Sequence, residues 1–182
     1  CPVTEAFAPF ANPIIMLFLG SFILARAMCV HGLDQRLAYS VLSVKGISTK
    51  KARILFALGL TSMFLSLWIS NTATTAMMYP IALGVLDAFR SDKETNKQTP
   101  FSVILLLALA YSSSVGGIGT PIGSPPNLIA IGLLERLIDY RVAFFQWMII
   151  GFLIMLPMYF VLFLLMKGKL KKGNGEMGKK SA

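Results

Sequence analysis

The chain is poor in charged and metal-binding side chains. Only 14% of its 182 residues are charged, and it has one histidine and two cysteines; an average soluble domain is about a quarter charged. Cys1 and Cys29 lack metal-ligand spacing, so neither a disulfide framework nor a metal cluster is expected. No acid or histidine lies within the apolar segments to activate a serine, so we expect no enzymatic activity.

The start of the sequence lacks both an initiator methionine and a signal peptide. It begins at Cys1 without a positively charged stretch. We therefore expect residues 1–182 to form a single membrane-domain fragment of a longer protein. The net charge of +9 could suggest nucleic acid, but the basic residues lie between apolar segments, where they set orientation in a membrane. No nucleic-acid partner is expected.

Apolar residues, in contrast, are abundant and occur in long blocks. They make up 55% of the chain, which predicts an all-α, multi-pass integral membrane protein with the lipid bilayer as its partner. We expect spans at residues 13–30 and 144–166, an amphipathic surface helix at 33–49, and a disordered basic tail at 167–182. Lysine and arginine gather in 31–53, 90–100 and the tail, so these segments should face the cytoplasm.

A first polar break interrupts the apolar run of residues 54–89, at Ser70-Asn71-Thr72 and the residues that follow. One helix over this run would reach about 54 Å, whereas the hydrocarbon core is about 30 Å thick. The chain must therefore fold back. A re-entrant helical hairpin with its tip inside the membrane is the favoured interpretation, and two short full spans are the alternative.

A second break, GGIGTPIGSPPN at residues 116–127, interrupts the apolar run of 101–134. Its glycines favour unwinding and its prolines prevent the preceding helix from continuing. Ser124 is expected to be a helix N-cap with Pro125 at the first helical position. The pattern predicts a discontinuous transmembrane helix, which is tolerated at depth only where its loose backbone is buried or lines a cavity.

Both breaks end by starting a helix, and helix N-termini attract anions. The expected caps are Asn71 or Thr72 in the first break and Ser124 in the second. Ser66 and Ser70 share one helix face, because they are four residues apart. With the Asn71 amide oxygen and carbonyls near Gly123, they could form a neutral oxygen shell for a monovalent cation such as sodium. Hydroxyls in such helices also commonly bond to helix carbonyls, and we assign Ser112–Ser114 to packing of that kind.

The two motifs together make the sequence resemble the divalent anion/sodium symporter family. Ser70-Asn71-Thr72 matches the family's signature at a hairpin tip, GGIGTPIGSPPN matches its unwound helix, and APFANPIIMLFLG at 8–20 is similar too. The resemblance implies a sodium-coupled symporter of di- or tricarboxylates such as succinate or malate. It implies an elevator-type homodimer with two inverted repeats, of which this chain carries one, in the inner membrane of a bacterium.

On that pattern, Ser66, Ser70, Asn71 and Gly123 would hold sodium, and Asn71, Thr72 and Ser124 would contact the substrate. Each motif occurs only once in this sequence, so the chain alone is expected to be incomplete for transport. The alternatives are a symporter of sulfate or another divalent anion, a sodium-independent dicarboxylate antiporter, and a structural membrane subunit without transport activity.

Overall fold

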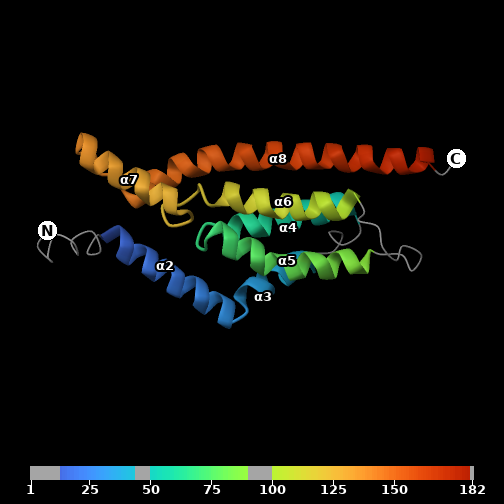
Figure 1. Ribbon diagram of the computed structural model, residues 1–182, viewed down its shortest axis with the longest axis horizontal. Helices are drawn as coiled ribbons and strands as arrows, with labels where there is room; N and C mark the ends of the chain where they lie inside the picture. The colour runs from blue at the N-terminus through green and yellow to red at the C-terminus, as the bar shows by residue number, and fades with distance from the viewer. Residues whose placement is uncertain (1–12, 44–49, 90–99, 181–182) are drawn as a thin grey trace, which may run out of the picture.

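The computed structural model describes residues 13–43, 50–89 and 100–180, and within these ranges every regular element is a helix (Figure 1). In chain order these are α2 (Pro13–Val30), α3 (Leu33–Leu42), α4 (Lys51–Leu65), α5 (Asn71–Ala88), α6 (Pro100–Gly116), α7 (Pro125–Ile138) and α8 (Phe144–Lys180). An all-helical fold is therefore confirmed for the described part of the chain.

The first two helices lie at one edge of the molecule. α2 covers residues 13–30, the range expected for the first span, and Gly32 adopts a φ of 62° in the turn to α3. α3 packs against α4 and α5. It accounts for residues 33–42 of the surface helix expected at 33–49; residues 44–49 lie outside the described ranges.

The centre of the fold is a bundle of α4, α5 and α6, covered on one side by α8 (Figure 1). Its core consists of apolar side chains from these helices, among them Ile54, Leu58, Met78, Leu105 and Leu109. Burying each such side chain contributes about 1.5–3 kcal/mol in water, and tight packing replaces that term where lipid surrounds the bundle.

Two close approaches fix the direction of these helices. A side chain at Gly59 would meet Ser112, and one at Gly116 would lie 2.2 Å from the Met63 carbonyl oxygen. α4 and α6 therefore run parallel, with their C-terminal ends side by side. α5 returns antiparallel to both, so the turn between α4 and α5 meets the end of α6.

α8 differs from expectation at its C-terminal end. The tail was expected to be disordered, but α8 continues as one helix to Lys180. Extending an existing helix needs no new nucleus, and lysine has a high helix propensity, so the apolar helix propagates into the tail. Within the described ranges, Phe144–Leu170 is the one helix long and apolar enough to cross a membrane, with a mean hydropathy of 2.6; Leu19–Val30 and α6 are shorter apolar helices.

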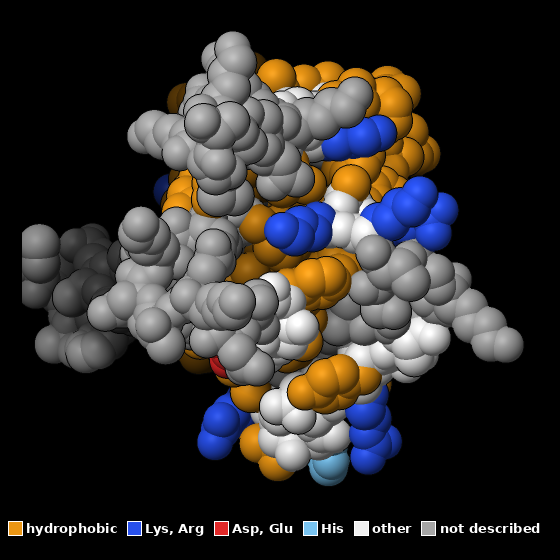
Figure 2. All heavy atoms as spheres, turned by 90° about the vertical axis from the view of Figure 1, so that its right-hand side faces the viewer, with side chains coloured by type: hydrophobic (Ala, Val, Ile, Leu, Met, Phe, Trp, Pro, Cys, Tyr) orange, Lys and Arg blue, Asp and Glu red, His pale blue; other side chains and the backbone are white. Residues whose placement is uncertain are grey.

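Basic side chains gather at the end of the molecule where α4 begins and α8 finishes. Figure 2 looks at this end and shows lysine and arginine side chains beside large apolar areas. Lys51 lies over the ring of Phe101 at 5.4 Å, and Lys167 lies over Phe163 at 5.9 Å. The turn between α4 and α5 is at the other end of α4, about 22 Å away for 15 residues.

Candidate ion and anion site

The turn at residues 66–70, hereafter the hairpin turn, joins α4 to α5. Ser70 is the N-cap of α5, and its hydroxyl accepts a hydrogen bond from the Ala73 backbone N–H at 3.3 Å. The expectation that Asn71 or Thr72 caps this helix was therefore wrong. The short serine side chain reaches the third N–H of the helix from an extended backbone, and Asn71 becomes the first helical residue.

The Asn71 side chain instead turns back across the hairpin turn. Ser66 donates a hydrogen bond from its Oγ to the Asn71 Oδ1 at 2.7 Å. Ser66 is fully buried and Asn71 is half-buried. Two of the oxygens expected in the cation shell are thus in direct contact.

The segment at residues 117–124, hereafter the α6–α7 loop, packs onto the hairpin turn. A Cβ atom at Gly117 would lie 2.2 Å from the Asn71 Oδ1, and one at Gly123 would lie 2.8 Å from the backbone oxygen of Ser66. Glycine at these two positions lets the loop backbone lie this close to the Asn71 side chain and to the Ser66 backbone. The structure therefore brings Ser66, Asn71 and Gly123 together, with Ser70 in the same turn.

Two residues that sequence reasoning did not select hold the loop in this place. Thr120 is fully buried, and its Oγ1 donates to the Leu67 carbonyl in the hairpin turn. Asn127 donates from Nδ2 to the carbonyl oxygens of Gly117 and Thr120, at 2.7 and 2.8 Å. Both lie inside the GGIGTPIGSPPN motif, where a threonine and an asparagine among glycines and prolines were the available signal.

Ser124 occupies the N-cap position of α7, but its hydroxyl makes no capping bond. The expected cap was wrong in this respect: Pro125 and Pro126 have no N–H, and the N–H of Asn127, the third helical residue, bonds to a backbone oxygen instead of the Ser124 hydroxyl. The N–H of Asn127 bonds to the Ser124 backbone oxygen at 3.1 Å. The Ser124 hydroxyl, one residue after Gly123, is thus not used in capping.

Thr72 lies at the edge of the same cluster, where it lines an open groove. It follows Asn71 directly and its side chain is exposed. The two breaks meet where Gly123 lies against Ser66 and Ser66 bonds to Asn71. Thr72 directly follows Asn71 and Ser124 directly follows Gly123, so each is one residue from this meeting point.

Four helix ends converge here. α4 and α6 bring C-terminal ends, whose helix dipoles favour a cation, and α5 and α7 bring N-terminal ends, whose dipoles favour an anion. Among the described residues that form this cluster, none carries a charge. The cluster therefore places helix ends that favour a cation beside helix ends that favour an anion, with no charged side chain among these described residues.

A groove of about 570 Å³ between α5 and α6 opens beside the cluster. In this α5–α6 groove the Thr75 and Ser113 hydroxyls are 2.7 Å apart. Its lining is rich in hydroxyl groups and consists of Asn71, Thr72, Thr75, Ala76, Tyr79, Ala110, Ser113 and Ser114. Asn71 and Thr72 therefore border an open groove, although most of its exposed lining is apolar.

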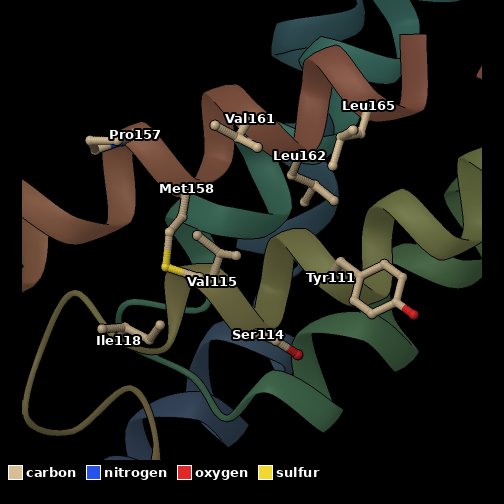
Figure 3. A pocket seen from close by; sticks show the side chains of 9 residues that line it. All are labelled: Tyr111, Ser114, Val115, Ile118, Pro157, Met158, Val161, Leu162 and Leu165. Atoms are coloured by element: carbon tan, nitrogen blue, oxygen red, sulfur yellow. The ribbon is translucent and has the colours of Figure 1, made fainter. Parts of the chain in front are cut away.

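A second groove of similar size, about 550 Å³, lies on a neighbouring face of α6, between α6 and α8 (Figure 3). In this α6–α8 groove, Val115, Met158, Val161 and Leu162 point toward one another, while the hydroxyls of Tyr111 and Ser114 point away. The Ser114 hydroxyl donates to the Ala110 carbonyl at 3.1 Å. This surface offers almost no hydrogen bonds and does not suit an anion or a metal ion.

Comparison with known proteins places the chain among transporters. The model of the citrate transporter family matches residues 1–177. An uncharacterized transporter of Haemophilus influenzae is 38% identical over 170 residues, which are 91% of this chain and 34% of that protein. The sodium-dependent dicarboxylate transporter SdcS of Staphylococcus saprophyticus is 38% identical over 151 residues, which are 81% of this chain and 29% of that protein. SdcS of Staphylococcus aureus strain USA300 is 40% identical over 146 residues, which are 78% of this chain and 28% of that protein. The chain spans about a third of the length of these relatives.

Proposed function

Because the chain belongs to the citrate transporter family, we propose that it carries one half of the transport site of a sodium-coupled symporter for di- or tricarboxylates. The resemblance to the divalent anion/sodium symporters is confirmed by the family match and by the identity to the SdcS transporters. The proposal rests above all on one observation: the two polar breaks meet, with Ser66, Asn71 and Gly123 in contact.

The cation site is the cluster at the hairpin turn. Ser66, Ser70 and Asn71 supply side-chain oxygens, and backbone oxygens beside Gly123 complete the shell. Sodium is a hard cation that prefers oxygen ligands, and a shell of neutral oxygens suits a single charge better than a double one. The ion also lies at the C-terminal ends of α4 and α6, where the helix dipoles favour it.

The anion site is on the other side of the same cluster. Thr72 and Ser124 offer hydroxyls at the N-terminal ends of α5 and α7, and the α5–α6 groove gives access to Thr72. A carboxylate there accepts hydrogen bonds from hydroxyls and backbone N–H groups without needing a basic side chain. The names of the family and of the SdcS relatives favour succinate, malate or citrate over sulfate.

The membrane placement is part of the proposal. With the basic end of α4 and α8 at the cytoplasmic surface of a bacterial inner membrane, the hairpin turn is about 22 Å deep, well inside a core of about 30 Å. α4 and α5 are then a re-entrant hairpin, and α6 and α7 are a discontinuous helix. The remaining length of the relatives leaves room for an inverted second repeat in a multi-pass, elevator-type homodimer.

The test is Asn71→Ala in the full-length protein that contains this chain. Reconstituted in liposomes, it should lose at least about tenfold in sodium-driven succinate uptake, because one cation ligand and one partner of Ser66 are removed. Ser43→Ala is the matched control, since this exposed hydroxyl, one residue after α3, bonds to the nearby Ser40 carbonyl. Undiminished uptake by the Asn71→Ala protein would refute the site. Uptake of sulfate, or of succinate without sodium, would instead support one of the alternative transport functions.

A further inference from the structure

We propose that Thr120 and Asn127 are positioning residues of the sodium site: they hold the α6–α7 loop at the distance from the hairpin turn at which the cation shell closes. This inference rests on the proposed function. Neither residue is assigned as a ligand. Both act through the backbone atoms that they fix.

Thr120 joins the two breaks across 53 residues of sequence. Its Oγ1 donates to the Leu67 carbonyl and accepts from the Gly123 N–H at 3.0 Å. The hydroxyl thus uses its donor on the hairpin turn and an acceptor site on the loop. Because Gly123 is held by Thr120 and Thr120 by Leu67, the backbone near Gly123 has a fixed place relative to Ser66.

Asn127 fixes the internal shape of the same loop. Its side-chain amide donates both hydrogen atoms, one to the Gly117 carbonyl and one to the Thr120 carbonyl. The loop therefore closes on itself from the first turn of α7. The positions of Gly117 and Thr120 relative to each other are therefore fixed. Gly117 faces the Asn71 Oδ1, and Thr120 bonds to Leu67.

The far side of the loop is held by α8. Trp147 donates from Nε1 to the Ile118 carbonyl at 3.1 Å, and a side chain at Gly151 would meet the carbonyl oxygens of Ile118 and Gly119 at 2.9 Å. The loop is thus confined between the hairpin turn and α8. Thr120 supplies a hydrogen bond on the hairpin side, so its removal should loosen the loop where it faces the cation site while the α8 side stays in place.

The experiment measures sodium binding by the purified chain in lipid nanodiscs. The midpoint of thermal unfolding is recorded against sodium chloride, with choline chloride keeping the ionic strength constant. Thr120→Val keeps the size of the side chain and removes the hydroxyl, whereas Thr120→Ser keeps the hydroxyl. Thr61→Val is the matched control, because Thr61 is also a buried threonine but bonds only within its own helix, to Ala57 at 2.9 Å.

We expect Thr120→Val to raise the half-saturating sodium concentration about tenfold, the effect of about one hydrogen bond. Thr120→Ser should stay near the parent chain, and Thr61→Val should leave the sodium dependence unchanged. If the thermal midpoint of Thr120→Val falls by the same amount in sodium and in choline, and its half-saturating sodium concentration equals that of the parent chain, the role of Thr120 is purely structural. That result would overturn the inference. If Thr120→Val does not fold, Asn127→Leu takes its place with the same expected and overturning results.

A different result would refute the proposed function instead. If the unsubstituted chain gains no stability from sodium over choline, it has no sodium site of the kind proposed, and the role of Thr120 fails with it. If the unsubstituted chain responds and the variant responds identically, only the positioning role is wrong.

Discussion

Replacing Gly117 with alanine tests how tightly the two breaks are fitted together. The new Cβ would lie 2.2 Å from the Asn71 Oδ1 and 2.9 Å from the other amide atoms of that side chain. Ordinary contact begins near 3.4 Å, so the Asn71 oxygen must retreat by about 1.2 Å, the difference between these two distances. The same oxygen accepts the hydrogen bond from the Ser66 Oγ at 2.7 Å, so a displacement of this size disturbs that bond.

The size of the effect follows from the two groups that lose their fit. An overpacked interior costs about 1–3 kcal/mol, and a buried hydroxyl left without its partner costs about 1–3 kcal/mol more. If at least about 1.4 kcal/mol of this total cost is lost from the free energy of sodium binding, the affinity for sodium falls at least tenfold. We therefore expect Gly117→Ala to lower the thermal midpoint in choline and to raise the half-saturating sodium concentration.

The assay is the sodium titration of thermal unfolding in nanodiscs, and Gly84→Ala is its control. Gly84 lies in α5, is exposed, and has open space where a Cβ would be added. Alanine there should stabilise the helix by about 0.5–1 kcal/mol without changing the sodium dependence. Should Gly117→Ala behave like Gly84→Ala, the close approach of the loop to Asn71 would be wrong, and so would the shell built on it.

Two further predictions concern α8 and the grooves. Tyr159→Phe removes the hydrogen bond from the Tyr159 hydroxyl to the Phe56 carbonyl at 2.6 Å, so the midpoint should fall by about 2–4 °C; an unchanged midpoint would contradict a stabilising bond there. After both native cysteines are replaced with serine, Tyr79→Cys in the α5–α6 groove should react with a membrane-impermeant thiol reagent. Val161→Cys in the α6–α8 groove should not, and equal labelling of the two would show that the grooves do not differ in access to water.

Much of the helical layout was predictable because the apolar blocks are too long to be single helices in a bilayer. The polar residues at Ser70 and after Gly116 interrupt them, and the structure turns or breaks at those places. Such signals are local: a few residues that disfavour continuing a helix decide the outcome. The closeness of Ser66 to Asn71 follows in the same way, from five residues of spacing across one turn.

The parts that were missed depend on contacts distant in sequence or on competition between neighbours. The bond from Thr120 to Leu67 joins residues with no shared periodicity, so nothing in the pattern of either segment indicates it. Ser70 and Asn71 are both good capping residues, and only the backbone geometry decides between them. Ser124 occupies the cap position that serine before proline predicts, but two prolines leave only the Asn127 N–H within reach, and that N–H bonds to the Ser124 backbone oxygen.

The neutral composition of the site has a consequence for acidity. The polar side chains that the described part of the chain contributes at and next to the hairpin turn and the α6–α7 loop are hydroxyls and amides, whose protonation does not change at physiological pH. This half of the site therefore has the same electrostatic character in an acidic and an alkaline medium. A proton can still act on uptake through the solute, because protonating a carboxylate removes the charge that the N-terminal ends of α5 and α7 would bind.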